Sequence, residues 1–77
     1  MRFEILWHPA AEHQLKDLGW HASESVDAAV IRFAETQRSD VEWVSPYYRL
    51  RVGHYRVRFT IDATTRTMNV LLVYRIR

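Results

Sequence analysis

Residues 47–61 read YYRLRVGHYRVRFTI, and apolar side chains alternate with polar ones on both sides of Gly53-His54. A period of two is typical of strands that bury one face. The sequence therefore predicts strands at residues 47–52 and 55–61, joined by a tight turn. The predicted apolar face holds Tyr48, Leu50, Val52, Tyr55, Val57, Phe59 and Ile61. The opposite, open face then collects Arg49, Arg51, Arg56 and Arg58.

The segments around this hairpin complete the fold. Residues 2–7 are rich in strand formers, and Pro9 suits the first turn of a short helix over residues 9–18 that ends before Gly19. Ser23 is a plausible N-cap for a second helix that runs to about Gln37. Residues 41–46 are expected to connect this helix to the hairpin. After a polar turn at 62–66, residues 67–76 predict a central strand, because they are apolar on both faces. The order β-α-α-β-β-β predicts an α+β fold in which a helical hairpin packs on one face of a small, mostly antiparallel sheet.

The length and composition bound the class of protein. With 77 residues, the chain is expected to form one domain over residues 1–77. Hydrophobic residues make up 48% and charged residues 26%, as in globular chains. The lack of cysteine excludes disulfides and thiol chemistry. No apolar leader or membrane-length segment is present, so we expect a cytoplasmic protein without membrane contact. Trp7, Trp20 and Trp43 are expected to fill the core.

The charges divide the chain in two. Residues 1–45 carry four basic and eight acidic residues, whereas residues 46–77 carry seven arginines and one acid, Asp62. The arginine fork matches phosphate with paired hydrogen bonds, and such asymmetry favours a nucleic-acid or acidic partner. A solvated basic sheet face is the alternative that composition leaves open.

The sequence lacks the residues that several classes of enzyme require. His8, Glu12 and His13 only approximate a zinc motif, so we expect no metal, and no cofactor or small-molecule ligand is indicated. The sequence also lacks a Walker loop and a carboxylate pair on the basic face. What remains is chemistry in which cations stabilise a phosphorane and the RNA 2′-OH is the nucleophile. Arg58, the ring of Tyr47 and the nearby His54 are candidate RNA-binding groups.

The order Arg-x-Arg-x-Gly-x-Tyr-Arg within residues 47–59, together with the closing strand at 70–75, resembles the RelE/ParE toxin family of type II toxin–antitoxin systems. The opening residues 3–12, with Leu15 and Leu18, are similar to the same family's first strand and helix. The resemblance covers nearly the whole chain. It implies a metal-independent endoribonuclease that cuts messenger RNA in the ribosomal A site.

The resemblance also implies roles for individual residues. Arg56 would hold the scissile phosphate, Arg75 would stabilise the phosphorane or the leaving oxygen, and Arg49 and Arg51 would orient the backbone and the 2′-OH. Family ribonucleases often carry a catalytic residue a few positions beyond the last strand arginine, whereas this sequence ends at Arg77. A ParE-like poison of DNA gyrase that is not itself an enzyme, and an inactive RNA-binding remnant, are therefore the alternatives. The expected partners are a cognate acidic antitoxin, the ribosome and mRNA.

Overall fold

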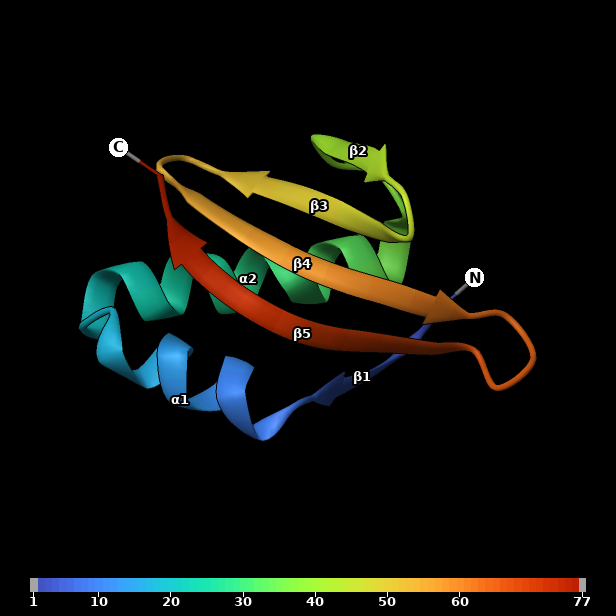
Figure 1. Cartoon of the computed structure of the whole chain (residues 1–77), viewed down its shortest axis with the longest axis horizontal. Helices are drawn as coiled ribbons and strands as arrows, with labels where there is room; N and C mark the ends of the chain where they lie inside the picture. The colour runs from blue at the N-terminus through green and yellow to red at the C-terminus, as the bar shows by residue number, and fades with distance from the viewer. Residues whose placement is uncertain (1, 77) are drawn as a thin grey trace.

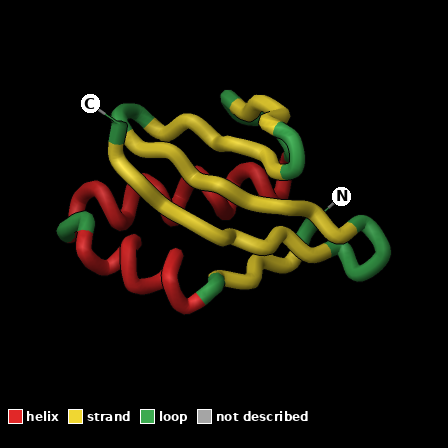
Figure 2. Tube along the Cα trace, in the orientation of Figure 1, coloured by secondary structure: helices red, strands yellow, loops and turns green. Residues whose placement is uncertain are grey.

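The computed structural model describes residues 2–76 and contains a five-stranded sheet with two helices on one face (Figure 1). The strands lie in the order β1-β5-β4-β3-β2, with β1 parallel to β5 and all other neighbours antiparallel. Figure 2 shows the β4–β5 pair crossing the middle of the molecule. The elements are β1 (Glu4–Trp7), α1 (Pro9–Asp17), α2 (Trp20–Thr36), β2 (Val41–Val44), β3 (Tyr47–Val52), β4 (Tyr55–Asp62) and β5 (Thr67–Arg75). This arrangement confirms the predicted α+β class and the helical hairpin on one sheet face.

The core lies between α2 and the helix-facing side of the sheet. It consists of Ala11, Val26, Val30, Phe33, Ala34, Leu50, Val57, Phe59, Met68, Val70 and Val73. Phe59 is at its centre, with ring centroids 5.0 Å from Phe33 and 5.4 Å from Tyr48. The alternation in residues 47–61 thus predicted the buried face correctly, with Tyr48 and Tyr55 packed against the core.

The second helix begins earlier than predicted, at Trp20 and not after Ser23. Gly19 has a φ of 89°, a backbone conformation that favours glycine, and it turns the chain directly from α1 into α2. The Gly19 carbonyl accepts the N–H of Ser23 at 2.9 Å, so Ser23 already lies in the first helical turn. This change leaves Trp20 73% exposed, so its expected place in the core was wrong.

Residues 41–44 form an edge strand, β2, which corrects the prediction of a plain connector at 41–46. The strand pairs with β3 from Val41 opposite Leu50 to Val44 opposite Tyr47, so the sheet has one strand more than predicted. Trp43 packs edge-on against Tyr48, with ring centroids 4.8 Å apart, yet it remains 58% exposed at the sheet edge. Of the three tryptophans, Trp7 alone packs against the core.

Strand β5 lies inside the sheet between β1 and β4, as the apolar run predicted, although β4 occupies the exact centre of the order. β1 pairs with β5 only as far as Val70, and α1 also packs against β5. There the Oε1 atom of Gln14 accepts the backbone N–H of Val73 at 2.8 Å. A bulge in the β4–β5 ladder lies next to this contact, because Arg58 pairs with Leu72 and Phe59 with Val70.

Replacing Gln14 by leucine is expected to lower the free energy of unfolding by about 1–3 kcal/mol, because the N–H of the buried Val73 loses its acceptor. Urea unfolding followed by circular dichroism measures the change. Gln14→Glu keeps an acceptor at the same reach and is the matched control. Equal stability of Gln14→Leu and the unchanged protein would show that this hydrogen bond does not contribute.

Candidate functional site

Four arginines meet on the sheet face that the helices leave open. Arg49 on β3 lies directly opposite Arg58 on β4, and Arg51 lies opposite Arg56. Figure 1 views the molecule from this side, with α2 passing behind β4 and β5. We call these four residues the arginine face. Like charges directly opposite each other in a sheet repel, so the arrangement favours binding of an anion.

Two carboxylates from the β2 side neutralise part of this face. Glu42 lies opposite Arg49, and its Oε1 accepts hydrogen bonds from Nε, at 2.8 Å, and from Nη2. Asp40, just before β2, lies with Oδ2 3.6 Å from Nε of Arg51. The hydrogen bond from Arg49 and its charge hold the pKa of Glu42 below the usual value, and Arg51 and Arg56 add smaller effects in the same direction.

Neither acid was predicted, because Asp40 was assigned to the break after the second helix and residues 41–46 to a connector. The signal was present in Val-Glu-Trp-Val, whose alternation is that of a short strand and whose glutamate then falls on the arginine side.

Arg56 is held at the tip of the β3–β4 hairpin. Its Nη1 donates hydrogen bonds to the carbonyls of Gly53, at 2.9 Å, and Tyr55, at 2.8 Å. Gly53 has a φ of 59°, which the tight turn requires and which glycine adopts without strain. Among residues 2–76, no carboxylate forms an ion pair with Arg56. The guanidinium is thus oriented by neutral carbonyls and retains its full charge for a ligand.

Arg58 stacks on Tyr47. Its guanidinium carbon lies 4.0 Å from the ring centroid, a cation–π geometry, and its Nε is buried without a hydrogen-bond partner in the described part of the chain. The predicted RNA-binding residues Arg58 and Tyr47 are therefore together. One face of the Tyr47 ring is already covered, so a base that stacks there competes with Arg58.

The other predicted residues lie apart from the arginine face. Arg75 pairs with Tyr55, one position beyond the pair of Arg56 and Tyr74, so it belongs to the helix-facing side at the exposed end of β5. His54 is exposed in the hairpin turn, where its carbonyl accepts the N–H of Ile76 at 2.8 Å. Tyr74 lies on the open face opposite Arg56. Two groups raise the pKa of Arg49. Glu42 has the larger effect, and the hydroxyl of Tyr74 has the next largest.

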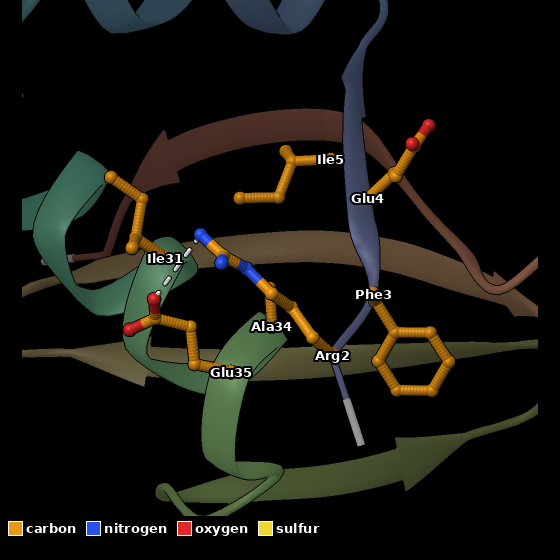
Figure 3. Close-up of a pocket in the computed structure, with 7 residues that line it drawn as sticks. All are labelled: Arg2, Phe3, Glu4, Ile5, Ile31, Ala34 and Glu35. Atoms are coloured by element: carbon orange, nitrogen blue, oxygen red, sulfur yellow. Dashed lines mark ion pairs between the residues drawn. The ribbon is translucent and has the colours of Figure 1, made fainter.

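Two grooves lie elsewhere on the surface. The larger, of about 720 Å³, runs between β1 and α2, where Arg2 reaches across to Glu35 at 3.4 Å (Figure 3). The smaller, of about 450 Å³, lies between the start of α2 and the hairpin turn and includes His21 and His54. Within residues 2–76 no three histidine or acidic side chains are grouped to hold a metal ion. None of the helices in this range is long and apolar enough to cross a membrane.

A sequence model described as the ParE toxin of the type II toxin–antitoxin system parDE matches residues 5–77. The chain belongs to this family. It is a toxin of a type II toxin–antitoxin system, as the resemblance of the hairpin residues implied. No curated protein matches the sequence of this toxin.

Solved structures of low sequence identity share the toxin's fold. A chain of the RelBE2 toxin–antitoxin complex from Mycobacterium tuberculosis is 21% identical, with a TM-score of 0.71 over 99% of this chain and 100% of that one. A chain of the archaeal RelE–RelB complex from Pyrococcus horikoshii OT3 is 18% identical, with a TM-score of 0.79 over 97% of this chain and 96% of that one. A chain of the intact E. coli RelBE complex is 16% identical, with a TM-score of 0.77 over 97% of this chain and 98% of that one.

Proposed function

We propose that this toxin is a ribosome-dependent mRNA endoribonuclease whose arginine face binds the phosphate backbone around the scissile bond. The observation that carries the proposal is the cross-strand register, which places Arg49 opposite Arg58 and Arg51 opposite Arg56 on a sheet face without a covering helix. Guanidinium groups give charge-assisted, bidentate hydrogen bonds to phosphate. Four of them on one surface match a polyanion better than a single small anion.

The proposed reaction uses the substrate's own nucleophile. The 2′-oxygen loses its proton and attacks the adjacent phosphorus, and the bond from phosphorus to the 5′-oxygen breaks. The departing 5′-oxygen takes up a proton, so the products are a 2′,3′-cyclic phosphate and a 5′-OH end. Arg56, which has no carboxylate partner within residues 2–76, holds the scissile phosphate and stabilises the extra negative charge of the phosphorane.

Arginine stays protonated and does not remove the 2′-OH proton. The rate enhancement in this proposal therefore comes from orientation and charge, with the proton passing to His54, to Tyr47 or to a group of the ribosome. The role that the resemblance implies for Arg75 requires RNA to bend around the end of β5, because Arg75 is on the other side of the sheet.

The experiment is to map the 5′ ends of a message in a purified translation system, with and without ribosomes. We expect cuts in phase with codons, with 5′-OH ends, only when ribosomes are present. Intact message would contradict the proposal.

Poisoning of DNA gyrase is the second candidate, because ion pairs on Arg49 and Arg51 suit a binding surface as well as a catalytic one. Supercoiling by purified gyrase, measured with the same toxin preparation, separates the two. Inhibited supercoiling together with an intact message would support gyrase poisoning as the function.

The proposed partner of the free toxin is a cognate antitoxin with an acidic segment that covers the arginine face. Ligands that bind only the folded state raise its stability by mass action. Addition of the neighbouring gene's product is therefore expected to raise the melting temperature and give a complex on a sizing column. An unchanged melting temperature and separate elution would contradict this partner.

A further inference from the structure

We infer that, in the free toxin, Glu42 and Asp40 compete with RNA phosphates for the site that Arg49 and Arg51 form. The inference rests on the proposed function in one respect, namely that the polyanion is RNA. It adds to that function an internal competitor at each of the two arginines.

The spacing of the two arginines fits neighbouring phosphates. Arg49 and Arg51 are two residues apart on β3, so both point to the open face and lie about 6.6 Å apart along the strand. Neighbouring phosphates of a stretched single strand are separated by a similar span. Proteins that bind single strands commonly track the backbone with such a row of cations.

The carboxylates stand where phosphate oxygens would bind. Glu42 accepts from Nε and Nη2 of Arg49, which is one edge of the guanidinium fork and the edge that a phosphate would also use. Asp40 makes a longer ion pair, with its Oδ2 3.6 Å from Nε of Arg51. A phosphate that uses these donors must therefore displace Glu42 from Arg49, and at Arg51 it competes with the negative charge of Asp40.

The carboxylates are open to replacement. The side chains are 33% and 54% exposed in the pair of Arg49 and Glu42, and 56% and 66% exposed in the pair of Arg51 and Asp40. Ion pairs with this exposure are weak, so RNA can displace them at a small cost in affinity. Within residues 2–76, Arg56 and Arg58 form no ion pair with a carboxylate.

The test measures binding without chemistry. A fluorescent 2′-O-methyl RNA oligonucleotide resists 2′-OH attack, and its anisotropy reports the affinity over a series of salt concentrations. Glu42→Gln keeps the shape of the side chain and removes its charge. We expect it to bind two- to fivefold more tightly than the unchanged toxin, with Asp40→Asn adding a similar factor. The slope of log affinity against log salt is expected to steepen by up to about 0.7 for each arginine released.

Two controls separate site occupation from a general charge effect. Glu24→Gln removes an exposed acid on α2 and changes the net charge equally. In the background of Arg49→Ala, Glu42→Gln is expected to have no further effect. Equal tightening by Glu24→Gln, or unchanged or weaker binding by Glu42→Gln, would overturn the inference.

The outcome also separates this inference from the proposed function. Ribosome-dependent cleavage by the unchanged toxin, without tightening in Glu42→Gln, would overturn the phosphate site alone. Tightening without any cleavage would support the phosphate site and count against the endoribonuclease. Tightening for a polyglutamate peptide of equal charge, but not for the oligonucleotide, would overturn RNA as the ligand.

Discussion

Replacing Arg56 by alanine is expected to slow ribosome-dependent cleavage by about 10²–10³-fold, the typical cost of removing one hydrogen-bond donor aimed at a developing negative charge. The fold is expected to persist, because within residues 2–76 the Arg56 side chain forms hydrogen bonds only with the turn carbonyls of Gly53 and Tyr55. Single-turnover cleavage on programmed ribosomes measures the rate, and the thermal unfolding curve measures the stability.

Two further variants sharpen this result. Arg56→Lys keeps the charge but not the planar fork. Its cleavage rate is therefore expected to fall between those of the unchanged toxin and Arg56→Ala. Arg32→Ala removes an exposed arginine from α2, on the helix side of the molecule, and is expected to cleave at the normal rate. Cleavage by Arg56→Ala within twofold of the unchanged toxin would remove Arg56 from the proposed site.

Replacing Phe59 by alanine is expected to have the largest effect on stability. Phe59 is fully buried and contacts the rings of Phe33 and Tyr48, so the change leaves a cavity between α2 and the sheet. Such a substitution costs about 3–5 kcal/mol. A domain of this length has only about 4–12 kcal/mol of stability, so Phe59→Ala is expected to be largely unfolded or close to it.

Urea titration followed by tryptophan fluorescence measures this effect. Phe59→Leu keeps most of the volume and is expected to lose less than about 1.5 kcal/mol. If Phe59→Ala unfolded at nearly the same urea concentration as the unchanged toxin, Phe59 would not be the centre of the core.

The alternation in residues 47–61 carried most of the information about the fold and the candidate site. It placed Leu50, Val57 and Phe59 on the buried side and, for the same geometric reason, brought Arg49 and Arg51 onto the open one. The pairing of Arg49 with Arg58 follows from the length of the turn at Gly53-His54, which fixes the register of the hairpin.

The missed features depend on contacts that short segments do not reveal. Within residues 2–76, strand β2 has only four residues and pairs only with β3, so its alternating pattern is a weak signal that the connector interpretation overrode. Glu42 was missed along with it. The β4–β5 register also includes a bulge beside Arg58 that alternation does not anticipate.

The central claim is that this toxin cuts RNA on its arginine face with the RNA's own 2′-OH. The most direct test is a message with a single 2′-deoxy nucleotide at the position cut in the translation system. The account predicts that this message remains intact at that position, while the all-ribose message is cut and bears a 5′-OH end. Continued cleavage of the 2′-deoxy message at the same position would contradict it, because the nucleophile would then come from elsewhere.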